Sequence, residues 1–343
     1  MNGSEKQFSF TRAAPSTSGR AKSNFLSVTV CAGAVLLIAT NGQAQNLFVA
    51  TSSSVIEITP GGAQTTFASG FVNPWGLAFN SAGDLFVANV GTESIIKITP
   101  SGAQSTFASG LGLNESSGLA FNSAGDLFVG SGYNGGGYIY EFTPGGLQST
   151  FASGLNSPAG LAFNSAGDLF EMDASSGSIN KFTPFGAKST FSTVVDGVGL
   201  AFNRAGDLFV AEGYNAGHII EITPQGLQST FASGFNYPQG LAFDSAGNLF
   251  VSDSGSIIEI TPGGVRSTFA SGVSYSSWDL AFQGETLPVP EPSSWLLLMS
   301  GIGALFGSCR SRPLRPYKNR KLMDSIQYCL ERRGKRPKME KAP

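Results

Sequence analysis

A single unit recurs through the middle of the chain, and its period limits the fold more than any other feature of the sequence. The string Gly-Leu-Ala-Phe begins at positions 76, 118, 160, 199 and 240 and returns as Asp279-Leu-Ala-Phe282, so the copies are 39 to 42 residues apart. Three further strings keep the same order in every copy: Asp/Asn-Leu-Phe, Thr-Pro-x-Gly and a short polar segment centred on phenylalanine. Together the copies fill residues 46–285.

Each copy predicts four short strands. In the second copy these are 76–80, 85–88, 94–99 and 104–108, separated by turns that contain Gly, Ser, Asp and Pro. No helical periodicity lies between them, which excludes a parallel βαβ fold. Four strands every 40 residues or so, repeated six times, predict an all-β fold: a six-bladed β-propeller of four-stranded antiparallel blades.

The phase of the repeat predicts how the ring closes. The first copy begins at its second strand (Asn46), and the last ends at a first strand (279–283). The C-terminal strand is therefore expected to join the first blade, which leaves no open edge. Eighteen of the 27 phenylalanines occupy three equivalent positions of the repeat, where each is expected to face the neighbouring blade and to supply the core. The charged position of strand three is expected on the solvent side. It is held by Glu57, Lys97, Glu141, Lys181, Glu221 and Glu259.

Charge and composition exclude several function classes. Residues 45–287 hold 18 Asp and Glu against 5 Lys and Arg, and this acidic body would repel a nucleic-acid backbone. The chain has one histidine, His218, and its three cysteines (Cys31, Cys309, Cys329) all lie outside the repeat. That inventory is poor for a zinc site or a Ser-His-Asp triad.

The two ends of the chain read as export and sorting signals. Basic residues precede an apolar run at 25–39, and the small residues Gly42 and Ala44 stand at the two positions that a signal peptidase reads. This pattern predicts a signal peptide over 1–44, cleaved after Ala44, although an uncleaved anchor is the alternative. After the repeat domain (45–286), residues 287–312 contain a Pro-Glu-Pro motif, a short apolar segment and arginines. The motif residues are Pro290, Glu291, Pro292, Arg310 and Arg312. A basic segment, 313–343, follows and is expected to be disordered.

This C-terminal pattern resembles the bacterial PEP-CTERM sorting signal. The resemblance implies transient membrane retention, processing by an exosortase, and a location at the cell envelope, at the cell surface or outside the cell. Membrane contact is expected through the terminal segments alone. Members of the family usually end soon after the arginines, so the basic segment leaves cleavage open.

The repeat itself resembles NHL repeats and the wider gluconolactonase/senescence-marker and virginiamycin-lyase propeller superfamily. In the lactonases this resemblance implies metal ligands in the central channel, just before the glycine of strand one. Here those positions hold no carboxylate and no asparagine; they are Trp75, Ser117, Ala159, Val198, Gln239 and Trp278. The resemblance to the lyases implies functional histidines in the channel, and the repeat domain holds one histidine, His218. We therefore expect neither catalytic residues nor a metal or other cofactor, and leave a structural Ca²⁺ on Asp173, Asp196 or Asp253 as an alternative.

The copies differ from one another mainly in the connections between strands two and three and between strands four and one. In a four-stranded meander these connections lie on the same side, and they carry the tryptophans and several tyrosines of the repeat domain. The predicted ligand-binding residues are Trp75, Tyr133, Tyr214, Tyr237, Gln239, Tyr275 and Trp278. Aromatic rings beside amide and hydroxyl groups suit a sugar or peptide ligand, although these rings could equally plug the channel or pack the loops.

Three functions remain open from the sequence. The first is an exported, non-catalytic propeller that binds extracellular polysaccharide or a surface protein through this variable side. The others are a metal-dependent lactonase- or lyase-type enzyme and a purely structural component of the envelope or matrix.

Overall fold

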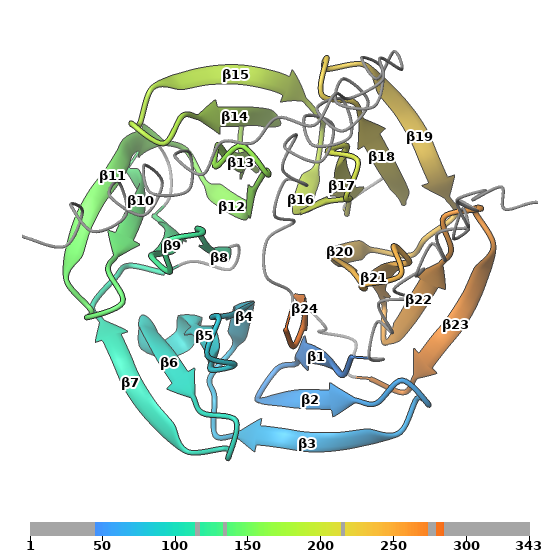
Figure 1. Cartoon of the computed structure of the whole chain (residues 1–343), viewed down its shortest axis with the longest axis horizontal. Helices are drawn as coiled ribbons and strands as arrows, with labels where there is room; N and C mark the ends of the chain where they lie inside the picture. Colours follow the sequence, from blue (N-terminus) through green and yellow to red (C-terminus); the bar gives the residue numbers. More distant parts are fainter. Residues whose placement is uncertain (1–44, 114–116, 133–135, 214–216, 274–278, 285–343) are drawn as a thin grey trace, which may run out of the picture. The chain divides into compact units, whose positions relative to one another are not determined.

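The computed structural model describes residues 45–113, 117–132, 136–213, 217–273 and 279–284. These residues form six four-stranded antiparallel sheets around a common axis, as Figure 1 shows, so the predicted propeller is confirmed. The predicted signal-peptide cleavage site at Ala44, the sorting residues and the basic segment lie outside the described residues.

We number the blades I to VI along the chain and give the strands of each from the axis outward. Blade I contains β24 (Leu280–Phe282), β1 (Leu47–Ala50), β2 (Ser54–Ile58) and β3 (Gln64–Ser69). Blade II contains β4 (Pro74–Phe79), β5 (Leu85–Asn89), β6 (Ser94–Ile98) and β7 (Gln104–Ser109), with the short 3₁₀ helix η1 (Val90–Thr92) after β5. Blade III contains β8 (Leu119–Phe121), β9 (Leu127–Ser131), β10 (Gly137–Phe142) and β11 (Gln148–Leu155).

The remaining blades repeat this order. Blade IV contains β12 (Pro158–Phe163), β13 (Leu169–Asp173), β14 (Ser178–Phe182) and β15 (Lys188–Thr193). Blade V contains β16 (Gly197–Phe202), β17 (Leu208–Glu212), β18 (His218–Ile222) and β19 (Gln228–Ser233). Blade VI contains β20 (Pro238–Phe243), β21 (Leu249–Asp253), β22 (Ser256–Ile260) and β23 (Arg266–Ser271).

The ring closes as the phase of the repeat predicts. Strand β24 pairs antiparallel with β1, so that Phe282 lies opposite Leu47 and Leu280 opposite Val49. The Ala50 N–H donates to the Asp279 carbonyl at 3.1 Å, which continues the ladder. The last strand of the chain thus completes the blade that the first strand begins, so the inner edge of β1 is paired.

The blades define two faces of the ring. In blade I, Phe282, Leu47, Ile58 and Gln64 are aligned across the four strands at the edge where the 59–63 turn lies. We call this side, with the turns between strands one and two and between strands three and four, the turn face. The connections between strands two and three and between strands four and one form the opposite side, the loop face.

The turns between strands one and two are held by a reciprocal Asn–Asp pair. In blade II the Asn80 Oδ1 accepts from the backbone N–H groups of Ala82 and Asp84, and the Asn80 side chain donates to the Asp84 carboxylate at 3.1 Å. Blade VI has the same turn with the two residues exchanged, as Asp244 and Asn248. The aspartates of the Asp/Asn-Leu-Phe string are therefore turn residues, as their sequence context predicts.

The phenylalanines form six trios that connect neighbouring blades. In each trio a ring from strand two makes edge-to-face contacts with a ring from strand four of its own blade and with a ring from strand one of the next blade. The ring centroid of Phe48, for example, lies 4.9 Å from the ring centroids of Phe67 and Phe79. The last trio, Phe250 with Phe269 and Phe282, joins blade VI to blade I. Edge-to-face pairs add about 0.5–1.5 kcal/mol each beyond their buried area, so the trios stabilise every blade interface.

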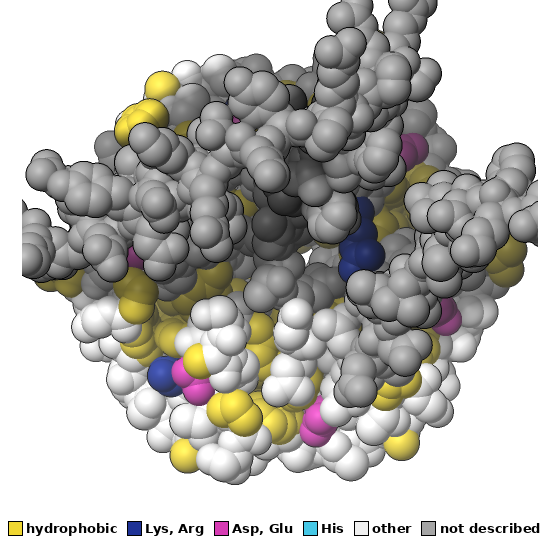
Figure 2. Space-filling view, viewed as in Figure 1, with side chains coloured by type: hydrophobic (Ala, Val, Ile, Leu, Met, Phe, Trp, Pro, Cys, Tyr) yellow, Lys and Arg dark blue, Asp and Glu magenta, His cyan; other side chains and the backbone are white. Residues whose placement is uncertain are grey.

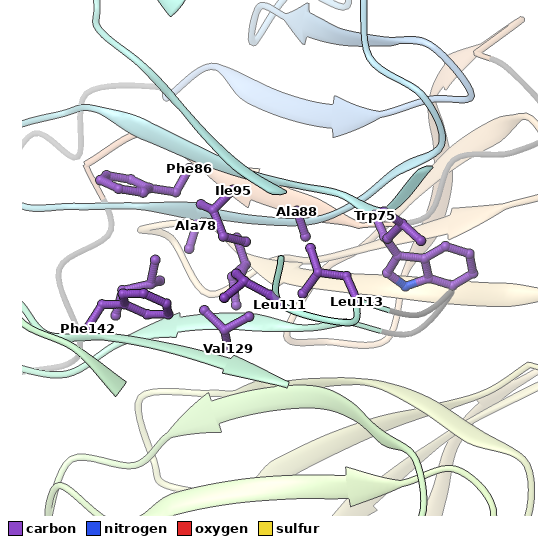
Figure 3. Packing of buried hydrophobic residues seen from close by; sticks show 12 residues of the cluster. Trp75, Ala78, Phe86, Ala88, Ile95, Leu111, Leu113, Val129 and Phe142 are labelled. Carbon is purple, nitrogen blue, oxygen red and sulfur yellow. The ribbon is translucent and has the colours of Figure 1, made fainter. Parts of the chain in front are cut away.

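A β-bulge places the strand-four ring in each trio. In blade I, Val55 pairs with Ala68 and Ile56 with Thr66, so Phe67 is the extra residue between them. The same register shift recurs at the equivalent phenylalanine of the other blades. A bulge re-aims one side chain, here toward the adjacent aromatic rings. Figure 3 shows the core that results between blades II and III, with Phe86 and Phe142 at one end and Trp75 at the other.

The charged position of strand three is half-buried rather than fully on the solvent side. Lys97 and Lys181 approach the turn carboxylates of Asp84 and Asp168 at 2.8 and 2.7 Å. Burial raises the pKa of Asp84, but the hydrogen bonds from Lys97 and Asn80 and the charge of Lys97 together outweigh burial, so the pKa is lowered. In blade V the same position holds Glu221, whose pKa is raised by burial and by Asp207 beside it. The side chains at this position therefore interact with the strand one–two turn.

Candidate functional site: the loop face and the central channel

The structure describes three of the seven predicted ligand-binding residues. Trp75, Tyr237 and Gln239 lie within the described residues, whereas Tyr133, Tyr214, Tyr275 and Trp278 lie outside them. Trp75 and Gln239 both line a cavity at the axis of the ring, and Tyr237 lies on the loop face. The described residues therefore divide into a buried channel group and an exposed group.

Trp75 is a core residue at the inner end of blade II. It is 7 % exposed and belongs to the hydrophobic cluster between blades II and III. Its indole lies beside Leu113 in Figure 3. Only the edge that lines the axial cavity is available to a ligand, so this ring packs the channel, in line with the alternative that the sequence left open.

Close backbone contacts narrow the central channel. A Cβ atom on Gly76, Gly118 or Gly160 would lie only 2.3–2.5 Å from a carbonyl oxygen of the next blade. The Gly118 N–H in fact donates to the Ala159 carbonyl across a blade boundary at 3.0 Å. Glycine at this position of strand one is thus required by close approach. The cavity that remains measures about 40 Å³, enough for about one water molecule.

Asp279 stands where five blades have this glycine. Its carboxylate accepts hydrogen bonds from the Leu77 N–H at 2.8 Å and from the Leu280 N–H at 2.9 Å, and it lines the same cavity. Burial raises the pKa of Asp279 to about 6, against the lowering effect of these two hydrogen bonds. The sequence contained a signal for this residue, the single departure from glycine, but its meaning depends on the geometry of the channel.

Gln239 supplies the second polar group of the cavity. Its side chain is 6 % exposed, and its Oε1 has no hydrogen-bond partner among the described residues. A buried amide oxygen of this kind usually has a partner, and a water molecule in the cavity would provide one. Gln239 and Asp279 together make the axial cavity polar on one side.

The channel does not present the donors that a hard divalent cation prefers. Such an ion takes several oxygen ligands, usually including more than one carboxylate. Among the described residues, Asp279 is the one carboxylate lining this cavity, and no three His, Cys, Asp or Glu side chains lie close enough together to hold a metal ion. A lactonase-type metal site therefore does not fit the residues that the structure places here.

Two of the three carboxylates considered for calcium accept hydrogen bonds from loop backbone. Asp173 accepts from the Asn156 N–H at 3.0 Å, and Asp253 accepts from the Asn236 N–H at 2.6 Å. Asn89 makes the equivalent bond to the Val72 N–H in blade II. In these three blades the last residue of strand two thus holds the connection that leads from strand four of the preceding blade into strand one.

His218 is paired at the end of its blade. Its Nδ1 lies 3.0 Å from the Glu212 carboxylate, across the strand pair that begins on the loop face. The pair occupies the place that Asp173 and Ser178 hold in blade IV. It resembles an ordinary cross-strand contact at the end of a blade.

Two aromatic features on the loop face are exposed. Tyr237 is 44 % exposed and has a left-handed backbone, with φ +73°. Tyr138, at the start of β10, is 39 % exposed and stacks on Tyr140, with the rings 5.7 Å apart and nearly parallel. The tyrosine pair was missed from the sequence because it lies inside a strand, where alternate tyrosines read as ordinary sheet residues.

A larger cavity, of about 370 Å³, opens on the turn face between blades II and III. Its walls include the Phe86 trio, the turn that begins at Thr143, and Lys97. This cavity was not predicted from the sequence, because its walls are repeat positions shared by all blades.

Comparison with known proteins shows the sorting signal and the fold. Residues 288–312 match the PEP-CTERM protein-sorting motif, which places the chain among proteins exported to the cell envelope or surface and recognised by an exosortase. No curated protein matches the chain in sequence. Among the described residues, no helix is long and apolar enough to cross a bilayer.

Solved propellers resemble the chain in fold at low identity. A chain of a nidogen/laminin complex matches with TM-score 0.63 and 16 % identity, over 71 % of this chain and all of that one. A gluconolactonase from Xanthomonas campestris matches with TM-score 0.54 and 18 % identity, over 62 % of this chain and 84 % of that one. A streptogramin B lyase matches with TM-score 0.51 and 16 % identity, over 70 % and 81 %. These likenesses concern the fold, which hosts both binding proteins and enzymes.

Proposed function

We propose that this exported propeller with its PEP-CTERM sorting motif is a non-catalytic binding protein, which engages extracellular polymer, in particular glycan, or a surface protein through its loop face. The observation that carries the proposal is the exposed side chain of Tyr237 on a left-handed backbone. A non-glycine residue with positive φ is uncommon, and a bulky one is a backbone outlier. The equivalent residue of blade II is Asn73, which tolerates this conformation better (φ +53°). An exposed aromatic side chain on a strained loop backbone supports a role in contact with a ligand.

The position of the exposed aromatics favours an extended ligand. Tyr237 belongs to blade VI and the Tyr138–Tyr140 pair to blade III, and these blades lie across the ring from each other in Figure 1. Pockets for small organic molecules usually measure about 300–1,000 Å³, whereas the axial cavity measures about 40 Å³. A polymer lying over the loop face could contact both blades without entering the channel.

The repeat itself supplies substitutions that test this proposal. Tyr237→Asn introduces the residue of blade II, and Tyr138→Ser introduces the residue that strand three carries at Ser54, Ser94, Ser178 and Ser256. The double variant is expected to fold at least as well as the wild type, since Tyr237→Asn relieves backbone strain. Retention of the purified protein on arrayed bacterial glycans and matrix polymers is expected to fall about tenfold, a loss of ~1.4 kcal/mol.

The control is Val195→Ser, which removes an exposed apolar side chain from the same face. Undiminished retention of the double variant would refute the aromatic binding face. Absence of retention for the wild type on every polymer and on cell-surface protein would favour the structural-component alternative. The enzyme alternative requires lactone hydrolysis or lyase turnover that the Asp279→Asn variant loses, together with metal bound in stoichiometric amount.

A further inference from the structure

The turn face exposes apolar side chains at four successive blades. Leu147, Phe185, Leu227 and Val265 are 67–98 % exposed, Phe185 most of all. Each lies in the turn between strands three and four, in blades III to VI respectively. The equivalents of Leu147 in blades I and II are Ala63 and Ala103. We call these four residues the apolar tips.

The repeat places the apolar tips at a common level of the ring. Leu147, Leu227 and Val265 each follow the same Thr-Pro-x-Gly turn, in which the carbonyl of the residue accepts from the threonine N–H. Phe185 is the third residue of that turn in blade IV. Figure 2 shows apolar side chains at the rim of the ring beside blade IV. Single exposed apolar residues are common on protein surfaces and need no partner, but these four lie in corresponding turns on one face of the ring.

The chain enters and leaves the propeller on this same face. The Gln283 N–H donates to the Asn46 carbonyl at 3.3 Å, and the Gln45 side chain donates to the Gln283 carbonyl at 2.9 Å. Gln283 also approaches the strand one–two turn of blade II, close to Gly83. The sorting motif begins at residue 288, four residues beyond Gly284, and four residues can span at most about 14 Å, so the motif begins close to the turn face.

These observations identify an occupant for the turn face. We propose that the apolar tips rest on the lipid surface of the membrane while the sorting segment holds the chain there, so that the loop face points away from the membrane. The tether fixes the ring at blade I, and the apolar tips provide contacts on blades III to VI, so together they support the ring on more than one side. This extends to the propeller itself the membrane contact that the sequence led us to expect of the terminal segments alone.

The contact is apolar rather than electrostatic. The repeat domain is acidic, with 18 Asp and Glu against 5 Lys and Arg over 45–287, so anionic headgroups would not attract it. The groove between blades II and III, directly before Leu147, adds the apolar walls of the Phe86 trio to the same face. By contrast the basic segment 313–343 would bind anionic lipid through charge, and salt would weaken that attraction. Salt therefore separates the two kinds of contact.

A fluorescent label on each face tests the proposed orientation. The full-length chain, with Cys31, Cys309 and Cys329 changed to serine, receives one new cysteine, Phe185→Cys or Val195→Cys, which carries an environment-sensitive dye. Vesicles of phosphatidylethanolamine and phosphatidylglycerol in 0.5 M salt present the membrane. The dye at 185 is expected to shift to the blue and to be quenched at least threefold more strongly by bilayer-embedded quenchers than the dye at 195.

A matched variant shows whether the apolar tips cause this contact. Leu147→Ala, Phe185→Gly, Leu227→Ala and Val265→Ala together install residues that other blades carry at these turns, and all four positions are exposed. With the dye on Ser101→Cys, in the blade II turn, quenching is expected to fall at least threefold in this variant. Equal quenching at 185 and 195, stronger quenching at 195, or no change at 101 in the variant would overturn the proposal. None of these outcomes affects the glycan-retention test, which concerns the other face.

Discussion

Replacing Glu171 by valine and Asn180 by isoleucine is expected to stabilise the propeller by about 3 kcal/mol at pH 8. The two residues face each other on β13 and β14, at positions where most blades have Val and Ile. The Glu171 side chain is fully buried; it accepts one hydrogen bond from Asn180 at 2.7 Å, and its other oxygen has no partner among the described residues. An apolar pair would fill the same space without burying a charge.

The same pair makes stability depend on pH in a defined direction. The pKa of Glu171 is raised from 4.5 to about 7, and burial is the main cause. The negative charge of Asp173 also raises this pKa, whereas the hydrogen bond from Asn180 and the positive charge of Lys188 lower it. Between these two values the folded state binds more protons than the unfolded state, so stability falls as the pH rises from about 4.5 to about 7. Urea unfolding at several pH values measures this slope.

Glu171→Gln is the matched control, because it keeps the hydrogen-bonding shape and removes the charge. It should remove the same pH dependence while gaining less stability than the apolar pair. Asp279 also titrates in this range, so the comparison is always between variant and wild type. Equal slopes in the wild type and both variants would contradict the assignment.

Phe282→Ala is expected to cost about 3–5 kcal/mol and to loosen the ring at one place. Phe282 is buried and lies 5.0 Å from Phe250 across the closing interface. Because β24 has only three residues, loss of this ring should let it separate from β1 before the rest unfolds. Hydrogen exchange followed by mass spectrometry should show faster exchange in β1 than in the equivalent strands of other blades.

Phe121→Ala is the control within the repeat. The ring of Phe121 makes the same contact with that of Phe86, at 5.1 Å between centroids, but its strand β8 is joined to β9 by a short turn of the chain. This variant should lose stability without selective exchange in β1. If both variants expose β1 to the same extent, the closing strand has no special role.

The sequence predicted the features that all copies share. Six equivalent strings gave the blades, and the phase of the first and last copies gave the β24–β1 closure. The phenylalanine positions predicted contacts between blades, although the bulge at Phe67 that directs one ring of each trio was not visible. A bulge depends on the pairing of two strands, and a single strand does not record it.

Residues that depart from the repeat were harder to interpret. Glu171 and Asn180 stand out one at a time, but only the register shows that they face each other. Trp75 was predicted in a loop on the binding face and lies largely in the core, because it belongs to the inner strand β4. Asp279 acquires its role from the closeness of the inner strands. In each case the missing information was a contact between distant parts of the chain.

The closed ring underlies both proposed faces, and one cross-link tests it most directly. Ala50 and Asp279 are a hydrogen-bonded pair, so Val49 and Leu280 form the next, non-hydrogen-bonded pair, the geometry in which side chains come closest. With the three native cysteines changed to serine, the Val49→Cys/Leu280→Cys variant is predicted to form a disulfide within each monomer under mild oxidation. Free thiols, or disulfides only between chains, would contradict a ring closed by its C-terminal strand.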